Sequence, residues 1–417
     1  MKKYFGSFFI AITFLVSSCN STPRATPEEI QALEARLKDG EQDQTLVHIY
    51  EQRSFQPLWI ADGKPTLRID ALTQALAQAP LHGLNPAEYA VTRPEKIDNP
   101  IEYELGLTRT LVKFAFDIAG QHDHVERVLS DVIAEDALTT AADRLAPAHV
   151  EYRNLQRALQ TFQGPSDQVE KIKLNLNRIR RMPVDLGARY IRVNVPEYRM
   201  HVIEDGREAL SMNVVVGRPQ TPTPIFSDAM THIVFSPYWN IPQSILKNET
   251  LPKVFEDENY LIRQNIEVIR VSDGQHQVVD PSEIDWSDPQ SRRRFHFRQR
   301  PGVRNSLGLV KFMFPNKFDV YLHDTPADNL FKLDERDLSH GCVRLEKPLE
   351  LAAYLLRDEP QWSEQKIKAA MHSGRERSVK LSEPIPVHIM YLTAWGTPEG
   401  GVEFAEDVYN LDMRAAE

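Results

Sequence analysis

Cysteine is nearly absent from this 417-residue sequence, which contains only Cys19 and Cys342. Two cysteines cannot supply the dense disulfide framework that holds many small exported domains together. If Cys19 is committed to another role, Cys342 is left as a single thiol. In an oxidising compartment an unpaired thiol is a liability unless its chemistry is used. This scarcity makes Cys342 a candidate nucleophile.

Long runs of positive charge are missing too. The formal net charge is −10, and the only tight basic cluster is the Arg triplet at residues 292–294. Nucleic-acid backbones are bound by clustered Lys and Arg side chains, so no nucleic-acid partner is expected and the triplet is interpreted as a solvated loop. With 41% hydrophobic and 26% charged residues, the composition is that of a soluble globular protein, and the length favours two or more folded units.

The apolar stretch at residues 4–16 is shorter than the roughly 20 residues that a bilayer-spanning helix needs. It follows Lys2 and Lys3 and precedes small residues, which is the pattern of a secretory signal. Residues 16–19, Val-Ser-Ser-Cys, resemble the bacterial lipobox, in which the cysteine is acylated and becomes the mature N-terminus. The sequence predicts a signal peptide at 1–18 and lipidation of Cys19 as a membrane anchor. The residue after Cys19 is Asn20 and not Asp, which resembles the pattern of lipoproteins sorted to the outer membrane of Gram-negative bacteria. A position on the outer membrane, facing the periplasm, is therefore expected.

The periodicity of apolar residues divides the rest of the chain. Apolar positions recur at helical spacing over residues 44–165 and 166–187, whereas residues 188–357 alternate with a period of two. The polar residues 19–43, which have no sustained apolar face beyond a possible short helix, are interpreted as a tether, and residues 358–417 as a C-terminal helix and closing strands. The predicted fold class is α+β, with an all-α domain at 44–165, a linker helix at 166–187 and a mainly antiparallel β-sandwich at 188–357.

The most informative segment is residues 320–346, in which His323 is followed after fifteen residues by Ser339, His340, Gly341 and Cys342. A free thiol has a pKa of about 8.5 and is mostly protonated at neutral pH, so a cysteine nucleophile needs a neighbouring imidazole or positive field. His323 can supply that imidazole. Gly341 permits a sharp turn that exposes successive backbone amides as a candidate oxyanion hole.

Two other interpretations of these residues stay open. Taken singly, a cysteine is most often a small buried apolar residue, and a histidine is most often a structural polar one. His323, His340 and Cys342 are also chemically suited to bind zinc. However, the spacing of His340 and Cys342 is not that of common zinc sites, and there is no second cysteine cluster. No metal or other cofactor is expected.

His323 and the Ser-His-Gly-Cys motif together resemble the signature of the L,D-transpeptidase catalytic domain, and Val343 and Arg344 continue it. The resemblance extends over residues 189–357 and includes the segments VVVGRPQTPTP, FSPYWNIP, LGLVKFMFPN and YLHDTP. Many members of the family have Asn at the position of Arg344, where Arg is a familiar variant. Residues 50–89, with FQPLWIADGKP and APLHGLNPAEY, resemble the N-terminal scaffold domain of one subgroup of the family.

This resemblance implies a role for each matching residue. Cys342 would be the nucleophile, His323 its base, and Asp324 the residue that orients His323 through its backbone carbonyl. The oxyanion donors would be the amides of Gly341 and Cys342. Ser339 and His340 would shape the loop, and His340 would be structural rather than a proton carrier. Arg344 would hold a substrate carboxylate. Tyr238 and Trp239 would form a wall of the donor cleft, unless they are aromatic residues of the core.

The implied reaction is attack of the thiolate on the carbonyl of the third residue, a diaminopimelate, of a peptidoglycan stem peptide, with release of the terminal D-Ala. The acceptor stays open. A neighbouring stem would give a 3-3 cross-link, a protein lysine would attach a lipoprotein, and water would make the enzyme a peptidase.

One departure from the subgroup is expected from chain length alone. Members with this scaffold often have a peptidoglycan-binding module before the catalytic domain, and the segment from Leu159 to Gly187 leaves no room for one. Two alternatives of another functional class remain, a stem-binding protein without chemistry and a structural lipoprotein that links membrane to wall.

Overall fold

The computed structural model describes residues 25–39, 43–120, 124–257, 259–272, 275–284 and 295–414. The predicted signal peptide, the lipidation site Cys19 and the Arg triplet at 292–294 lie outside these residues. The described chain forms two compact units. The first draws on the chain up to Ala79, on Asn85–Asp117 and on the residues up to Leu145. The second draws on Pro80–Leu84, on the residues from Ile118 and on the chain from Ala146 onward.

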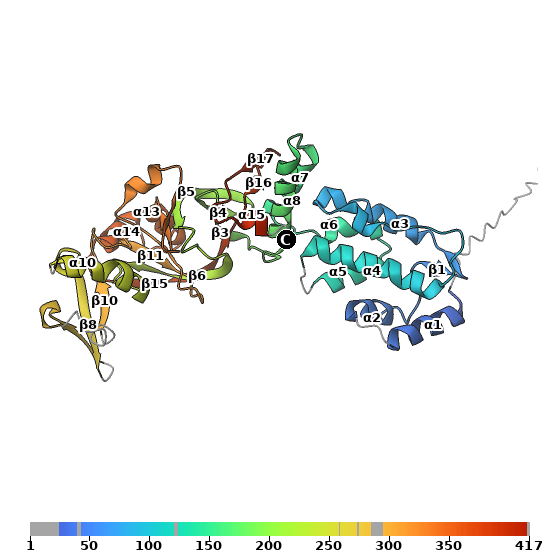
Figure 1. Ribbon diagram of the computed structural model, residues 1–417, viewed down its shortest axis with the longest axis horizontal. Coiled ribbons are helices and arrows are strands. Elements are labelled where there is room, and N and C mark those ends of the chain that lie inside the picture. The colour runs from blue at the N-terminus through green and yellow to red at the C-terminus, as the bar shows by residue number, and fades with distance from the viewer. Residues whose placement is uncertain are drawn as a thin grey trace, which may run out of the picture. The chain divides into compact units, whose positions relative to one another are not determined.

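The first unit is helical, as the sequence predicts, and its elements are drawn in blue to cyan (Figure 1). Its core is fixed by one buried carboxylate. Glu104 in the middle of a long helix accepts the backbone amides of Leu58, Trp59 and Ile60 and the hydroxyl of Tyr50. The elements are α1 Pro27–Lys38, α2 Gln44–Glu51, β1 Ile60–Ala61, β2 Lys64–Pro65, α3 Arg68–Leu76, η2 Pro86–Tyr89, α4 Pro100–Ala119, α5 Val125–Ala134, η3 Leu138–Thr140 and α6 Ala141–Leu145.

The predicted tether at residues 19–43 is wrong for the part that forms α1. Thr26 and Glu29 form a capping box that starts this helix, and Leu33 and Leu37, one turn apart, are buried. The carboxylate of Glu29 also accepts the amide of Gly63 at 2.7 Å. The helix packs into the first unit although only two of its apolar residues face the core, which is too few to stand out in the sequence.

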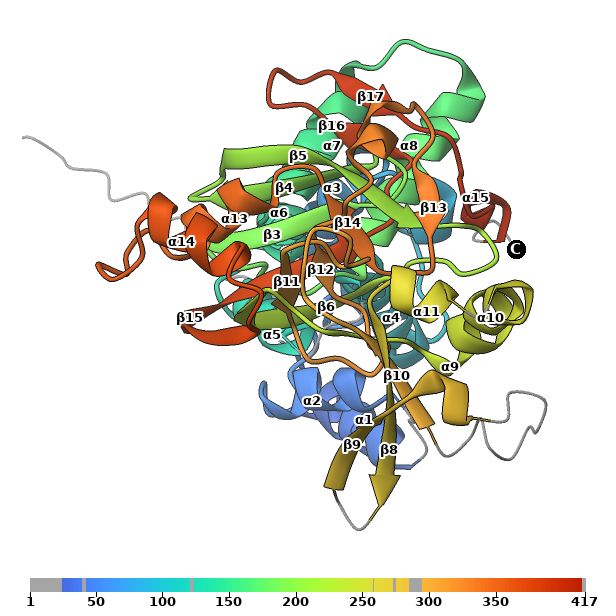
Figure 2. The same ribbon diagram turned by 90° about the vertical axis from the view of Figure 1, so that its left-hand side faces the viewer.

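The second unit is built on one nine-stranded sheet (Figure 2). The strand order is β13-β5-β14-β12-β11-β6-β15-β3-β4, and β4 also pairs with β5, so the sheet closes on itself. Most neighbours are antiparallel, and three pairs are parallel. The strands are β3 Arg189–Asn194, β4 Arg199–Glu204, β5 Arg207–Gly217, β6 Phe226–Phe235, β11 Val310–Met313, β12 Leu322–His323, β13 Asp337–Ser339, β14 Val343–Leu345 and β15 Arg377–Met390.

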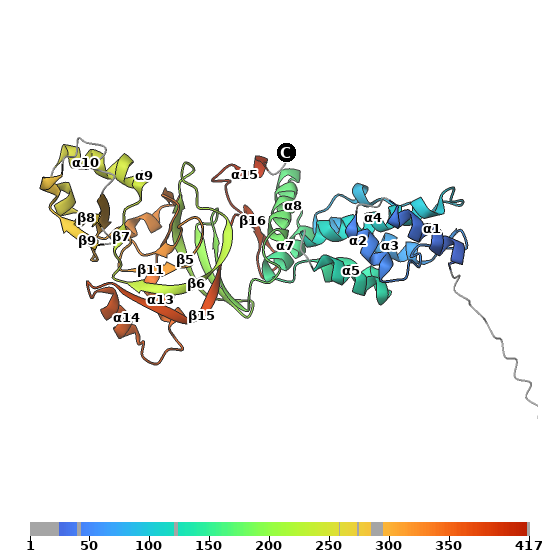
Figure 3. The ribbon, with the colours of Figure 1, turned by 90° about the horizontal axis from the view of Figure 1, so that it is seen from below.

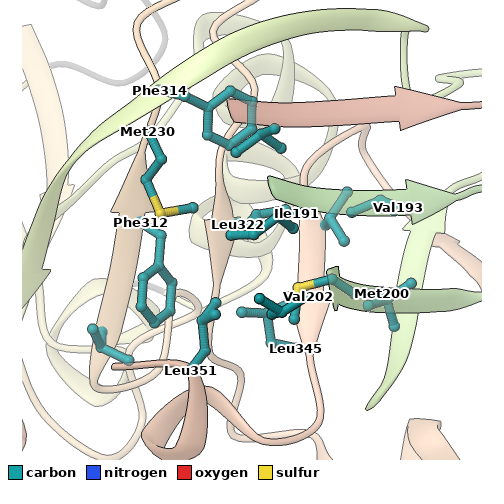
Figure 4. Close-up of a cluster of buried hydrophobic side chains, with 14 of the residues drawn as sticks. Ile191, Val193, Met200, Val202, Met230, Phe312, Phe314, Leu322, Leu345 and Leu351 are labelled. Atoms are coloured by element: carbon teal, nitrogen blue, oxygen red, sulfur yellow. The ribbon is translucent and has the colours of Figure 1, made fainter. Parts of the chain in front are cut away.

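Alternation along these strands sends one set of side chains into a shared core. The core also takes residues from α13 Pro348–Leu355 and α14 Glu364–Met371. The apolar side chains that point inward from these strands form one buried cluster, so the interior of the closed sheet excludes water. Figure 4 labels ten of the buried side chains: Ile191, Val193, Met200, Val202, Met230, Phe312, Phe314, Leu322, Leu345 and Leu351.

The predicted domain boundary at residue 357 falls inside this fold. Strand β15 lies between β6 and β3 in the middle of the sheet, where it is paired along most of its length. The residues after 357 therefore complete the core of the same unit rather than forming an addition to it.

A smaller subdomain is inserted between β6 and β11. Its sheet has the order β7-β10-β8-β9, is antiparallel throughout and packs on its own hydrophobic cluster, which includes Leu261, Val268 and Phe297. Figures 1 and 3 show this small sheet apart from the main one. Its elements are β7 Trp239–Asn240, α9 Gln243–Ile245, η4 Leu246–Thr250, α10 Leu251–Glu256, α11 Tyr260–Arg263, β8 Ile266–Ser272, β9 Gln275–Val279, η5 Pro281–Glu283 and β10 Phe295–Gln299.

The second unit begins earlier than the sequence predicts. Helix α7 Val150–Thr161 was expected in the N-terminal domain, but it packs on β16 Ala394–Gly396, which pairs with β17 Val402–Phe404. The contact is so close that a Cβ on Gly396 would meet the backbone of Asn154 at 2.2 Å. Helix α8 Ser166–Arg180 follows α7, and α15 Leu411–Arg414 ends the described chain. Among the described residues no helix is both long and apolar enough to cross a membrane.

Candidate active site

Cys342 lies in the tight turn between β13 and β14. Gly341 makes the turn with φ of 114°, a conformation that side-chain-bearing residues rarely adopt. The buried hydroxyl of Ser339 closes the turn, because it donates to the carbonyl of Cys342 at 2.6 Å and accepts the amide of Gly341 at 3.1 Å. Thr223 from the chain after β5 donates to the carbonyl of Gly341 at 2.8 Å. The backbone around the thiol is held from both sides.

His323 is placed beside this turn by strand pairing. Strand β12 is parallel to β14, with Leu322 opposite Val343 and His323 opposite Arg344. The Nδ1–H of His323 donates to the backbone carbonyl of Asp324 at 2.5 Å, which leaves Nε2 to act as a base. This carbonyl is the group that the family resemblance implied would orient the imidazole of His323.

The carboxylate of Asp324 has a separate task. Its two oxygens accept the amides of Leu309 and Thr325, each at 2.7 Å. These bonds fix the backbone at Asp324 and so fix the direction of the carbonyl that His323 contacts. Asp324 therefore acts on the imidazole indirectly, through backbone that its own side chain anchors.

Cys342 and His323 open into one cavity of about 850 Å³. Gly341 and Asp324 act through their backbone atoms and do not line it. The walls come from the main sheet and from the inserted subdomain, and they include the other residues predicted from the sequence: Tyr238, Trp239, Ser339, His340 and Arg344. The cavity thus brings together side chains that are up to about a hundred positions apart in the sequence.

Burial disfavours the charged form of both reactive groups. Burial raises the pKa of the Cys342 thiol above its usual range, and a hydrogen bond with the backbone of Tyr321 and the nearby charge of Arg344 oppose this only in part. Burial, followed by the charges of Arg344 and Lys311, lowers the pKa of His323 to about 3. A thiolate–imidazolium ion pair, which the sequence led us to consider, is disfavoured because both charged forms would lose their hydration.

One predicted oxyanion donor is occupied. The amide of Gly341 already donates to the hydroxyl of Ser339, so it is not free to receive a developing oxyanion in this geometry. The amide of Cys342 itself remains the candidate donor. Ser339, expected near the substrate, is buried and acts mainly by shaping the turn.

His340 is turned towards the inserted subdomain. Its Nε2 lies 2.5 Å from the carboxylate of Glu249 on η4, and Glu249 lies 3.8 Å from the guanidinium of Arg218. An imidazole engaged in this way links the loop to the inserted subdomain.

Sequence reasoning missed Lys311, which also lines the cavity. It sits on β11, directly opposite His323 on β12. The signal was present, because Lys311 is the only charged residue in the apolar segment 309–314 and alternates with the core residues Val310 and Phe312. Glu249 was missed as well, and its helix gives no comparable signal.

Comparisons with known proteins match both parts of the chain to domain families. A model of the L,D-transpeptidase catalytic domain matches residues 188–371, and a model of the scaffold domain matches residues 44–159. A Haemophilus influenzae protein whose name assigns it to the L,D-transpeptidases is 32% identical over 297 residues. The match takes in 70% of this chain but only 59% of that protein, so the chain spans less than two thirds of the relative's length.

Solved structures give weaker likenesses. An L,D-transpeptidase from Mycobacterium smegmatis is 13% identical with a TM-score of 0.23, over 49% of this chain and 58% of its own. L,D-transpeptidase 3 from Mycobacterium tuberculosis, solved in complex with a faropenem-derived adduct, is 16% identical with a TM-score of 0.23, over 49% of this chain and 60% of its own. Overall superposition at this level adds nothing to the argument from the site.

Proposed function

We propose that this chain is an L,D-transpeptidase that acts on peptidoglycan stem peptides with Cys342 as nucleophile and His323 as base, because residues 188–371 match the catalytic domain of that family. The observation that carries the proposal is the shared cavity of these two side chains, with His323 oriented by the carbonyl of Asp324. These residues are the components that nucleophilic catalysis by a thiol uses: a nucleophile, a base and a group that orients the base.

The first half-reaction starts from the neutral pair. As the sulfur of Cys342 attacks the carbonyl of the third stem residue, the thiol proton passes to Nε2 of His323. The amide of Cys342 is placed to donate to the oxyanion, an interaction of about 3 kcal/mol in systems where one donor has been removed. The C–N bond then breaks, His323 gives its proton to the leaving D-Ala amine, and a thioester remains.

The second half-reaction reverses these steps with a new nucleophile. An acceptor amine attacks the thioester carbonyl and gives its proton to His323, after which the sulfur leaves and takes up a proton again. An amine of a neighbouring stem gives a 3-3 cross-link, and a protein lysine attaches a lipoprotein. Water in the same position gives hydrolysis. Transfer to a stem amine is the outcome we propose.

The test is incubation of the purified protein with tetrapeptide muropeptides, followed by mass spectrometry of the products. We expect loss of D-Ala, a thioester on Cys342 and 3-3 linked dimers, all abolished in Cys342→Ala. Products without dimers would identify a peptidase. Binding of the muropeptides without thioester or D-Ala release would instead identify a stem-binding protein and overturn the proposed reaction.

We also propose that the protein is exported and held on the outer membrane by acylated Cys19, facing the periplasm where peptidoglycan lies. The support is the lipobox-like sequence after a short apolar stretch. Stable anchoring needs more than one acyl chain, which a lipidated N-terminal cysteine provides. Cys19→Ala should move the protein from the membrane fraction to the soluble periplasmic fraction. Retention in the membrane after a high-salt wash would contradict the anchor.

A further inference from the structure

Three side chains that carry or accept positive charge lie in one row across neighbouring strands of the main sheet. Lys311 on β11 is paired with His323 on β12, and His323 is paired in turn with Arg344 on β14. Paired residues of adjacent strands project from the same face of a sheet. All three line the cavity that holds Cys342, so the base is flanked on each side by a cation.

Neither flanking cation has an acidic partner at ion-pair distance among the described residues. The acid that acts on Lys311 from farther away is Glu376, whose carboxylate accepts the amide of Tyr238 at 2.7 Å. Arg218, in the same cavity, differs because it has Glu249 at 3.8 Å. Burial lowers the pKa of Lys311 and of Arg344, as expected when a cation is desolvated without a close counter-charge. The pair is therefore suited to receive an anion from outside the chain.

We propose that Lys311 and Arg344 together bind the α-carboxylate of the leaving residue, so that the enzyme selects donor stems that end in a free carboxylate. This inference rests on the proposed function, because it identifies the donor that the reaction of Cys342 uses. Lys311 is the residue that this proposal adds. With Arg344 it forms a carboxylate-binding site that has one cation on each side of His323.

The reaction itself places a carboxylate here. The leaving nitrogen takes its proton from His323 and must lie within hydrogen-bond distance of that imidazole. The carboxyl carbon of an α-amino acid is two bonds from its nitrogen, a distance of about 2.5 Å. Side chains that neighbour His323 on the same face of the sheet, roughly 5 Å away at Cβ, are those that such a carboxylate meets first. These are Lys311 and Arg344.

Binding of this carboxylate also prepares the base. Burial holds the pKa of His323 low, and the charges of Arg344 and Lys311 add to that effect. An anion between the two cations offsets their charges just as His323 takes the proton of Cys342. A donor with a neutral terminus leaves both charges uncompensated, so it should bind less well and react more slowly.

The test compares two donors with the full-length protein: a tetrapeptide stem ending in D-Ala carboxylate and the same stem ending in D-Ala carboxamide. We expect the unsubstituted enzyme to prefer the carboxylate in kcat/KM by about 10- to 100-fold, the size of one to two charge-assisted hydrogen bonds. Lys311→Met should lose most of this preference by slowing the carboxylate donor while changing the carboxamide donor by less than about threefold. Lys311→Arg should restore the preference.

Lys317→Met is the matched control, because this exposed lysine lies close by in the sequence and does not line the cavity. It should leave both rates unchanged, and thermal unfolding should show that each variant is folded. Equal use of the two donors by the unsubstituted enzyme, or an equal loss on both donors in Lys311→Met, would overturn the carboxylate site and leave the proposed function standing. Failure of the unsubstituted enzyme to release a leaving group from either donor would overturn the proposed function instead.

Discussion

At the scale of single residues, the burial of Cys342 and His323 sets the pH at which the thiol reacts. Burial raises the pKa of Cys342, and the pKa of His323, lowered to about 3, leaves no imidazolium to stabilise a thiolate at neutral pH. In a Cys19→Ala protein, where Cys342 is the only thiol, labelling by iodoacetamide should therefore have its midpoint above the value of about pH 8.5 that a free thiol shows. Rates of mass increase measured from pH 6 to 11 check this.

Two substitutions sharpen this prediction. Arg344→Gln removes a charge that favours the thiolate, so the midpoint should move farther up. His323→Ala removes a neutral group and should move it little. A midpoint below pH 7 in the otherwise unsubstituted protein would show that an ion pair forms after all.

The sequence predicted residues that the structure places around one cavity, but it did not predict their protonation. Residue types and spacing led to Cys342 and His323, because a single thiol after a glycine turn with a distant histidine is a rare combination, and the family resemblance implied the carbonyl of Asp324 as the group that orients His323. The pKa values depend on desolvation by side chains from the main sheet and the inserted subdomain, and no local pattern reports that. The sequence also could not show that the amide of Gly341 is already hydrogen-bonded, because that bond depends on the rotamer of Ser339.

At the scale of elements, the turn before β11 determines how His323 is oriented. Gly308 has φ of 61°, and a Cβ there would meet the Cγ of Asp324 at 2.3 Å. Gly308→Ala should push the carboxylate away from the amides of Leu309 and Thr325 and shift the carbonyl that holds His323. Misplacement of a catalytic group by about 1 Å can cost about 100-fold, so we expect a loss in kcat/KM of that order. Turnover of tetrapeptide stems measures it.

Gly374→Ala is the control for Gly308→Ala. Gly374 has φ of 65°, so alanine brings similar backbone strain, but nothing lies within 4 Å of its Cβ position. Its kcat/KM should stay close to that of the unsubstituted enzyme. If both variants lose activity equally, the effect is general strain and not displacement of Asp324.

Helix α1 gives a second prediction at this scale. Leu33 is fully buried, so Leu33→Ala should destabilise the first unit by about 2–5 kcal/mol, the usual range for a buried leucine. Gln31→Ala, on the exposed face of the same helix, should stay within about 0.5 kcal/mol. Denaturant unfolding followed by circular dichroism measures both. Equal, negligible effects would restore the interpretation of residues 19–43 as a tether.

The type of each secondary-structure element was easier to predict from the sequence than the strands with which it pairs. The period-two alternation of residues 188–357 correctly predicted strands, and the helical spacing before them predicted helices. Alternation is the same in either sheet of the second unit, so it could not show that β8 belongs to the inserted subdomain or that β15 joins the main sheet. Strand pairing is non-local, and it depends on which apolar faces can be covered together.

At the scale of the whole molecule, the second unit includes segments that come before the first strand of its main sheet and after the last one. Glu151 on α7 accepts the hydroxyl of Tyr190 at 2.6 Å and lies 3.4 Å from the guanidinium of Arg192, and both partners are on β3. The same helix contacts Gly396 near the C-terminus. We therefore expect the catalytic unit to need α7 for its stability, although the change in periodicity places the domain boundary after this helix.

Two truncated proteins distinguish these boundaries. A protein that starts at Ala146 keeps α7, whereas one that starts at Val169 loses it and leaves the hydroxyl of Tyr190 and the charge of Arg192 without Glu151. Loss of the helix removes buried contacts and hydrogen bonds that contribute several kcal/mol to the free energy of unfolding. The melting temperature of the shorter protein should therefore be at least about 5 °C lower. Glu151→Ala in the longer protein should reproduce only part of that decrease, because the apolar contacts of α7 remain. Equal melting temperatures of the two truncated proteins would show that the catalytic unit begins after α7 and that this helix contributes nothing to its stability.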